Sequence, residues 1–452
     1  MTGRYALNSI LIGGGAGTSP NAMKTSVTAR LFLIVASSLP VLCALGCGAA
    51  VRHSNAIDAC SLALSPHAGD AAIDKEIIRL QETTRTSRDQ SLALEQLGWA
   101  YVQKARVSYD LGFYKLAEQC AICLESRNRD SAEALLLRGH VLDSLHRFSE
   151  AEAIARRLAE TRGAPFDYGL LGDTLMEQGR LSEAIDAYQK MIDLKPGPYS
   201  YSRVAHVRWL KGDLEGALDM MRKAAAATSP RDAESAAWAY TRLAMYEFQA
   251  GSPANAERTC SVALQLQNDY APALLARSRV LLATNRNAEV VQLMQRAVSL
   301  NPVPEYEWLL SEALRAAGRN DEARAVEDEL KQSGASEDPR TVALFLATRL
   351  EQPDTAIMLV EQELKARDDV FTLDALAWSL AAAGRVNEAY EPMHRALAEG
   401  TQDARLFYHA GRIAALGGQK QKARLMLNKA VAMKQMLLPS EREGLSKTLA
   451  EL

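Results

Sequence analysis

The sequence predicts an all-α fold, a right-handed solenoid of about ten stacked helix-turn-helix repeats that ends in a C-terminal capping helix. The first observation is composition: of 452 residues 48% are hydrophobic and only 6% aromatic, with abundant Ala and Leu, which favours closely packed helices over β-sheet. The second is a small residue that recurs every 33 or 34 residues along most of the chain. The third is a glycine that stands five residues before many of these positions. Such a period is typical of a repeat array, so the length does not imply several globular domains.

The recurring small residue serves as a marker for each unit. Successive markers are 34, 33, 33, 39, 34, 33, 33, 33 and 34 residues apart. They are Ala117, Ala151, Ala184, Ala217, Ala256, Val290, Ala323, Ala356, Ala389 and Ala423. Twelve residues before most markers stands a second small residue: Gly139, Gly172, Ala205, Ala244, Ser278, Ser311, Ala377 and Gly411.

This spacing predicts a helical hairpin in each unit. The first helix carries the second small residue, and a glycine in a left-handed turn ends that helix. The marker lies on the second helix, where the two helices cross so closely that only a small side chain leaves room for the opposing backbone. A bulky residue at Ala184 is therefore expected to cost about 1–3 kcal/mol of stability. The turn glycines are Gly112, Gly179, Gly212, Gly251, Gly318, Gly384 and Gly418.

Some units are irregular, and both ends of the array differ from its interior. Seven extra residues between Gly98 and Ala117 predict a longer leading helix in the first hairpin. An insertion is expected at 228–234, and unit eight lacks a turn glycine at 349–356. The expected segments are an N-terminal extension and signal peptide at 1–46, a linker at 47–70, the solenoid at 71–437 and the capping helix at 438–452. The solenoid is expected to begin with a leading helix at residue 71.

The pattern resembles the tetratricopeptide repeat family over about 350 residues, from Gln90 to Gln435. The resemblance implies a curved solenoid whose first helices line a concave groove for protein or peptide partners. It also implies a scaffold that is not an enzyme and needs no cofactor or metal. The groove positions of the family correspond here to Tyr199, His206, Trp209, Trp238, Arg279, Trp308, Glu312, Arg315, Asp374, Trp378, Tyr408 and Arg412.

Trp, Tyr and Arg dominate binding hot spots, so these groove positions as a set favour a peptide or protein ligand. The alternative is that the same side chains wedge between neighbouring first helices. The basic segment from Ala404 to Ser440, which contains no Asp or Glu, is open to two interpretations as well. It is either a solvated face or a site that docks an acidic partner or an anionic surface.

The N-terminus has the pattern of an export signal. A polar stretch ending at Arg30 precedes 16 apolar residues at 31–46, too few for a membrane span of about 20. The following Ala-Leu-Gly-Cys resembles the signal of bacterial lipoproteins, which implies lipidation of Cys47. The alternatives are a secretory signal without a lipid or an uncleaved anchor. Translation is expected to start at Met23, with Met1 as the alternative.

No catalytic, nucleotide or metal-binding motif stands out. The glycine-rich stretch at 10–19 runs into the signal instead of a helix, and the HExxH and GxSxG motifs are absent. Cys120 and Cys123 form a CxxC within a predicted helix, which favours buried or idle thiols over redox or metal chemistry. The six cysteines do not specify a disulfide framework. A net charge of −3 does not indicate nucleic acid as a partner.

These features predict an exported scaffold at the bacterial cell envelope, anchored by lipid and facing the periplasm. The runner-up is a periplasmic or secreted adaptor without a lipid. A further alternative is an enzyme with a cryptic site. Such an enzyme would turn over a substrate, and substitutions of groove residues would abolish that activity. A cytosolic regulator would retain its N-terminus at Met1 or Met23.

Overall fold

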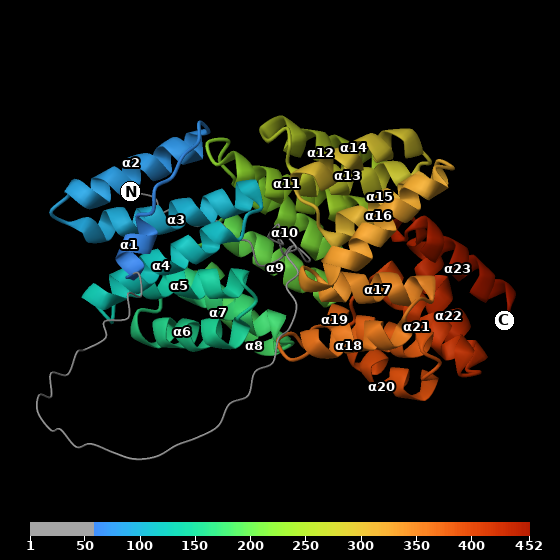
Figure 1. Ribbon diagram of the computed structural model, residues 1–452. Coiled ribbons are helices and arrows are strands. Elements are labelled where there is room, and N and C mark those ends of the chain that lie inside the picture. Colours follow the sequence, from blue (N-terminus) through green and yellow to red (C-terminus); the bar gives the residue numbers. More distant parts are fainter. Residues whose placement is uncertain (1–57) are drawn as a thin grey trace, which may run out of the picture.

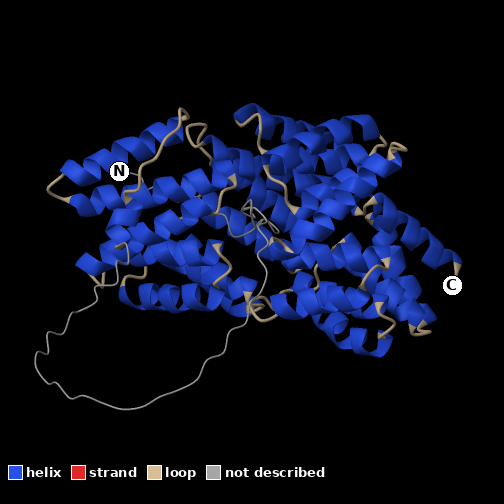
Figure 2. Ribbon diagram, in the orientation of Figure 1, coloured by secondary structure: helices blue, strands red, loops and turns tan. Residues whose placement is uncertain are grey.

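A computed structural model describes residues 58–452, and this range consists of helices and connecting turns without a strand (Figures 1 and 2). The predicted signal, the lipidation site Cys47 and residues 47–57 of the predicted linker lie outside the described residues, and the remainder of that linker contains a five-residue helix at 59–63. The expected α-solenoid is confirmed. Ten hairpins follow one another, preceded by two helices and followed by one.

The N-terminal half of the described chain contains α1 and α2 and the first five hairpins. Their bounds are α1 (Ala59–Ala63), α2 (Ala72–Thr86), α3 (Gln90–Ser108), α4 (Gly112–Arg127), α5 (Ala132–Ser144), α6 (Phe148–Thr161), α7 (Pro165–Glu177), α8 (Leu181–Leu194), α9 (Pro198–Leu210), α10 (Leu214–Ala226), α11 (Ala233–Gln249) and α12 (Pro253–Leu266).

The C-terminal half contains the other five hairpins, two short 3₁₀ helices (η1 and η2) and the last helix. Their bounds are α13 (Ala271–Ala283), α14 (Asn287–Leu300), α15 (Pro304–Ala316), α16 (Asn320–Ser333), η1 (Gly334–Ser336), α17 (Pro339–Arg349), α18 (Pro353–Glu363), α19 (Val370–Ala382), α20 (Val386–Leu397), α21 (Ala404–Leu416), α22 (Lys420–Ala432), η2 (Lys434–Met436) and α23 (Pro439–Ala450).

The small residues lie at close contacts between helices, within a hairpin at Gly172 and Gly411 and toward the next hairpin at Gly139. All ten markers have 0% of their surface exposed. A Cβ atom added at Gly172 would lie 2.3 Å from the Tyr188 ring, and one at Gly411 would lie 2.6 Å from the Leu427 side chain. Tyr188 and Leu427 each stand four residues after a marker. At these two positions the small residue therefore makes room chiefly for a side chain of the second helix, and not only for its backbone.

Six of the seven predicted turn glycines adopt the left-handed conformation, with φ between 74° and 80°. The prediction is wrong for Gly112, which is the first residue of α4. Tyr109 takes the left-handed position instead, with φ of 58°. In the eighth hairpin, which lacks a turn glycine, Leu350 and Gln352 both have positive φ.

The irregular units have the expected form. Helix α3 is 19 residues long, against 13 for the first helix of most later hairpins. The insertion at 228–234 forms the loop before α11 and the first residues of that helix. The eighth hairpin is short, because α17 and α18 each contain 11 residues.

A disulfide joins Cys60 of α1 to Cys123 of α4, with 4.9 Å between their Cα atoms. The expectation of idle thiols was therefore wrong for Cys123. The sequence could not show the pair, because its members are 63 residues apart and meet only when α1 packs on the first hairpin. Cys120 and Cys260 are free and buried, as expected, and burial raises the pKa of the Cys260 thiol to about 12.

The superhelix closes on itself, so turns of its third and fourth hairpins meet loops of its later hairpins (Figure 1). Lys211 forms an ion pair with Glu399, and the Thr401 hydroxyl donates to the carbonyl of Leu210 at 2.7 Å. The backbone approaches closely there. A Cβ atom at Gly179 would lie 2.1 Å from the carbonyl oxygen of Asp368.

A buried ion pair lies at the centre of this junction. Arg367 contacts Glu177 at 2.6 Å, and the two residues are 6% and 9% exposed. Burial raises the pKa of the Glu177 carboxyl, and the positive charge of Arg367 acts against that rise. The guanidinium also lies over the ring of Phe148, 5.2 Å from its centroid.

The C-terminal segment closes a second contact across the superhelix. The Gln435 amide lies 3.4 Å from the carbonyl oxygen of Phe248 and 3.3 Å from that of Gln249, both on α11. Met436 packs against a buried cluster that contains Phe248 and Val280. Helix α23 then packs on α21 and α22 and reaches α15. The concave face is therefore narrow and partly filled by the chain itself.

We predict that Gly172→Ala destabilises the fold by about 1–3 kcal/mol, because the added methyl group overlaps Tyr188. The ring cannot easily retreat, since it is buried and its hydroxyl contacts Asp173 at 2.8 Å. Urea unfolding of the purified chain measures the change. Gly197→Ala is the control, because no atom lies within 4 Å of its added Cβ. Equal urea concentrations at the unfolding midpoints of the two variants would contradict the claim that the space at Gly172 is needed for Tyr188.

We predict that Arg367→Met destabilises the junction by about 3–5 kcal/mol, because it leaves Glu177 buried without its counter-charge. The double variant with Glu177→Leu is expected to recover part of that loss. Arg385→Met is the control: its pair with Glu388 is exposed, so a loss below about 1 kcal/mol is expected. Urea unfolding at pH 7 compares the three variants. A double variant that loses more than the single one would refute the pairing argument.

Candidate functional site

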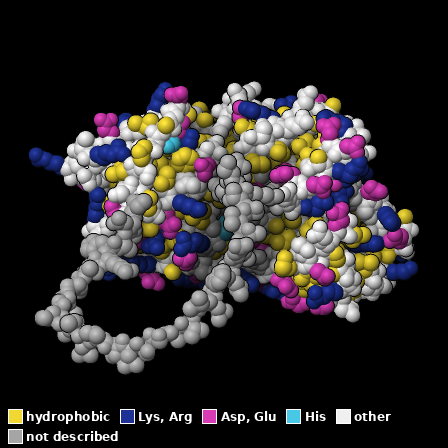
Figure 3. Space-filling view, viewed as in Figure 1, with side chains coloured by type: hydrophobic (Ala, Val, Ile, Leu, Met, Phe, Trp, Pro, Cys, Tyr) yellow, Lys and Arg dark blue, Asp and Glu magenta, His cyan; other side chains and the backbone are white. Residues whose placement is uncertain are grey.

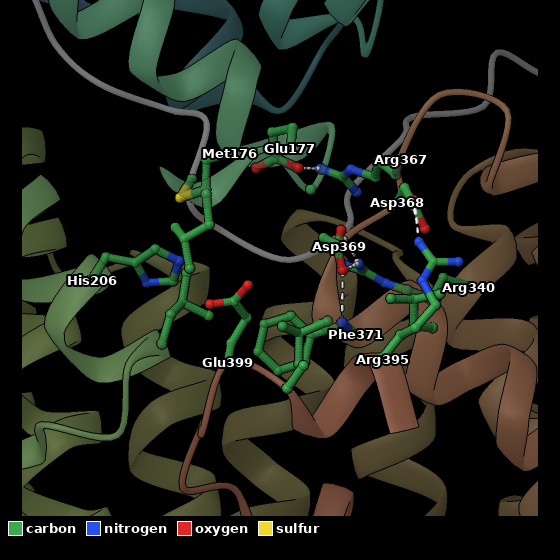
Figure 4. Close-up of a pocket in the computed structure, with 16 residues that line it drawn as sticks. Met176, Glu177, His206, Arg340, Arg367, Asp368, Asp369, Phe371, Arg395 and Glu399 are labelled. Carbon is green, nitrogen blue, oxygen red and sulfur yellow. Dashed lines mark hydrogen bonds and ion pairs between the residues drawn. The ribbon is translucent and has the colours of Figure 1, made fainter. Parts of the chain in front are cut away.

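Two neighbouring cavities lie between the halves of the superhelix. The first, called here the junction cavity, has a volume of about 280 Å³ and is shown in Figure 4. The second, the central cavity, has a volume of about 210 Å³. They share residues Arg340 and Phe371 in their walls.

The junction cavity is rich in charges, but these charges neutralise one another. Figure 4 shows Glu177 facing Arg367, and Asp369 directed toward Arg340. Asp368 pairs with Arg395, and Glu399 with Lys211. Each acidic side chain of the wall therefore has a basic partner within the chain. This arrangement is what a structural joint between two parts of a superhelix requires.

The central cavity is built by the first helices of seven successive hairpins, α9, α11, α13, α15, α17, α19 and the start of α21. Met436 of η2 and the following Leu438 complete the wall. The first helices thus line the concave face, as the repeat pattern predicts. The aromatic residues of the wall are Trp209, Tyr246, Tyr306, Trp308 and Phe371.

The aromatic walls are held by specific contacts. Trp209 stacks on Phe371 with ring centroids 5.6 Å apart, and its indole nitrogen donates to the Gln249 side chain at 2.7 Å. The Trp308 indole nitrogen donates to Glu312 at 3.3 Å. These contacts give the cavity rigid, apolar walls, which suit an anchoring side chain of a partner.

Four arginines line the central cavity, and three of them have carboxylate partners. Arg279 contacts Glu305 at 2.7 Å, and Arg340 contacts Asp369 at 3.2 Å. Arg405 pairs with Glu441 of α23. The fourth is Arg242 of α11, which contacts a tyrosine and a histidine.

The two other acidic groups of the wall are held within the chain. Asp374 contacts Nδ1 of His409 at 2.9 Å, and His409 is fully buried. Asp403 caps α21 by accepting from the backbone nitrogen of Leu406 at 3.0 Å. Burial raises the pKa of the Asp403 carboxyl. Neither carboxyl is paired with Arg242.

Seven of the twelve sequence-predicted groove residues line cavities. Trp209, Arg279, Trp308 and Asp374 meet at the central cavity, although Trp308 is only 2% exposed. His206 lines the junction cavity. A third cavity, of about 140 Å³, is lined by the remaining two, Tyr199 and Trp238.

Three further predicted residues contact the C-terminal segment. Glu312 accepts from the backbone nitrogen of Ser440 at 3.1 Å, and Arg412 contacts Glu451 at 2.8 Å. Tyr408 is 5% exposed, and its hydroxyl lies against Gly444 of α23. The segment after α22 therefore covers the end of the groove to which these residues belong.

The last two predicted residues line none of these cavities and contact other helices of the solenoid. Trp378 is 6% exposed and stacks on His409 with ring centroids 4.0 Å apart. Arg315 contacts Glu327 of the next helix at 2.5 Å. Trp378 thus lies between neighbouring first helices, α19 and α21, which is the alternative role that the sequence left open. Arg315 instead contacts the second helix of its own hairpin.

The basic segment at 404–440 is also partly neutralised within the chain. Arg405 and Arg412 pair with acidic residues of the C-terminal segment, and Arg424 donates to the carbonyl of Leu452 at 2.6 Å. Lys429 lies over the ring of Phe407, 5.0 Å from its centroid. On the face shown in Figure 3, basic and acidic side chains are interspersed.

Several residues of the central cavity escaped the sequence analysis. Arg242 and Tyr246 stand four and eight residues after Trp238, so one face of α11 could have been noted from helical spacing. The insertion before α11 obscured the register of this unit. Phe371, Arg405 and the residues after α22 enter the cavity only through the closure of the superhelix, for which the sequence has no local signal.

Residues 58–452 contain no cluster of three or more His, Cys, Asp or Glu side chains placed to hold a metal ion. Within the same range, no helix combines the length and apolar character needed to cross a membrane.

Several solved structures are similar to this chain at low identity. Yeast Tom70 is 12% identical with a TM-score of 0.38, covering 84% of this chain and 92% of Tom70. Human IFIT1, solved as a dimer with PPP-AAAA, is 12% identical with a TM-score of 0.46, covering 83% and 96%. PilF of Pseudomonas aeruginosa is 15% identical with a TM-score of 0.38, covering 45% and 92%.

No curated protein sequence matches the chain. Two stretches match family profiles described as tetratricopeptide repeat, residues 168–198 and 275–338. The first stretch spans α7 and α8, and the second runs from α13 to the start of α17. Both coincide with hairpins that the marker spacing predicts. The solenoid of this protein therefore contains tetratricopeptide repeats.

Proposed function

We propose that this protein is a non-enzymatic scaffold that binds partner proteins or peptides on its concave face, at the central cavity. The observation that carries the proposal is the convergence of seven first helices on one cavity with aromatic walls. Rigid aromatic side chains in a concave site offer a partner a large apolar contact area. The volume of about 210 Å³ is below the roughly 300–1,000 Å³ of small-molecule sites, so one or two side chains are the best fit.

We further propose that the scaffold is exported to the bacterial cell envelope and anchored by lipid at Cys47. The sequence support is the apolar stretch at 31–46 and the lipoprotein-like residues that end in Cys47. The disulfide between Cys60 and Cys123 adds support of a different kind, because such bonds persist mainly in oxidising compartments. A periplasmic or secreted form without lipid remains the alternative.

We predict that a photo-crosslinking amino acid at Met245 captures a partner in living cells. Met245 lines the central cavity and is half-buried. A crosslinker at Leu275, on the neighbouring wall helix α13, should capture the same protein. Asp219 is the control, because it lies exposed on α10, a second helix.

The captured protein would then be purified and its affinity for the full chain measured. Trp209→Ala is expected to weaken binding at least tenfold while the circular dichroism spectrum is retained, because the substitution removes an aromatic wall. Capture from Asp219 alone, or equal binding by the Trp209 variant, would show that partners bind elsewhere.

We predict that the chain incorporates labelled palmitate and sediments with membranes, and that Cys47→Ala abolishes both. The reason is that the acyl chains are the proposed membrane anchor. Cys43→Ala is the matched control, since this cysteine lies within the apolar stretch four residues before Cys47. Labelling that survives in Cys47→Ala would refute this anchor, and an exported but unlabelled wild type would establish the alternative without lipid.

A further inference from the structure

Arg242 is the one arginine of the central cavity wall without a carboxylate partner in residues 58–452. Its Nη2 donates to the Tyr246 hydroxyl at 3.3 Å and lies 3.5 Å from Nδ1 of His206. The guanidinium also lies 5.3 Å from the centroid of the Tyr246 ring. A hydroxyl and a ring face orient a guanidinium, but they do not neutralise its charge.

The histidine partner does not supply a negative charge either. Burial lowers the pKa of His206 well below its usual range, and the positive charge of Arg242 lowers it further. His206 is therefore neutral at neutral pH. The half-buried Arg242 thus presents an uncompensated positive charge to a cavity with aromatic walls.

The uncompensated charge of Arg242 distinguishes the central cavity from the junction cavity. In the junction cavity every acidic side chain has a basic partner, so no charge is left to select a ligand. In the central cavity Arg279, Arg340 and Arg405 are paired in the same way. Among the wall arginines, the guanidinium on α11 is the one that residues 58–452 leave available for a ligand, and a carboxylate would match it in charge and hydrogen-bonding geometry.

We propose that the central cavity recognises a peptide segment in which an acidic side chain adjoins a large apolar side chain. The acid contacts Arg242, and the apolar group packs among the aromatic walls. This inference rests on the proposed function and specifies its ligand. The combination fits because the cavity has room for one or two side chains and offers one free charge.

The acid is expected within the peptide and not at its end. The chain itself shows how a segment passes this wall: it enters from α22, contributes Met436 and Leu438, and leaves into α23. A bound peptide that continues in both directions places side chains, and not its terminal carboxylate, in the cavity. The ligand class is therefore an internal Asp or Glu beside Phe, Leu or a similar residue.

The test uses an array of acetylated, C-terminally amidated hexapeptides that contain every pair of central residues, probed with the purified full chain. Peptides that pair Asp or Glu with a large apolar residue are expected to bind best. Replacing the acid by its amide is expected to weaken binding about tenfold or more, the effect of a hydrogen bond to a charged group. Replacing the apolar residue by Ala is expected to weaken binding as well.

Variants of the chain test whether Arg242 is the residue that causes the preference for acidic peptides. Arg242→Gln is expected to bind acid and amide peptides equally, whereas Arg242→Lys keeps part of the preference because it keeps the charge. Arg222→Gln is the matched control, an exposed arginine on α10 outside the cavity wall, and should behave as wild type. Unchanged thermal unfolding of each variant shows that the fold is retained.

The inference fails if acid and amide peptides bind alike, or if the acid preference survives in Arg242→Gln. It also fails if the amidated peptides do not bind and the same peptides made with a free terminal carboxylate do. These outcomes differ from failure of the proposed function, in which the crosslinker at Met245 captures no partner. A partner that is captured there and binds Arg242→Gln with unchanged affinity would overturn this inference alone.

Discussion

The close crossing of two helices within each hairpin is the constraint on which the rest of this structure depends. Gly172 shows its nature, because the Tyr188 ring occupies the space that a Cβ atom would need. The marker on the partner helix, Ala184, is buried completely. Small residues at both positions let two helices approach until larger neighbours interlock. Eight of the ten hairpins carry small residues at both positions, so the core is spread along the solenoid in several buried clusters and has no single globular centre.

The curvature that accumulates over these hairpins produces the cavities of the candidate site. Each hairpin contacts mainly its neighbours, but the superhelix turns far enough for hairpins more than 150 residues apart to touch. The buried pair of Arg367 and Glu177 holds one such contact, and the segment around Met436 holds another. The groove expected of an open solenoid is thereby divided into small cavities. This explains why a cavity suited to one or two side chains, and not a long open channel, is the candidate site.

Charge compensation separates the paired groups of the concave face from Arg242. A buried ion pair needs an excellent geometry to offset the cost of desolvation, so paired groups such as Asp369 and Arg340 are best understood as parts of the fold. Arg242 lines the same cavity but is half-buried, and its hydrogen-bonding partners within residues 58–452 are Tyr246 and a neutral His206. An unpaired charge in a partly buried site is costly to the folded chain alone. A ligand that supplies the missing carboxylate would remove that cost on binding.

The sequence by itself determined the helices, most of their turns and the pairing into hairpins, because these depend on side chains within about one repeat of each other. It also placed first-helix residues such as Trp209 and Arg279 toward the concave face. The tertiary structure decided which of them face a cavity and which, like Trp378, pack between helices. It alone joined Cys60 to Cys123 and brought Phe371 beside Trp209. These contacts depend on small rotations summed over many repeats, and such a sum leaves no local pattern in the sequence.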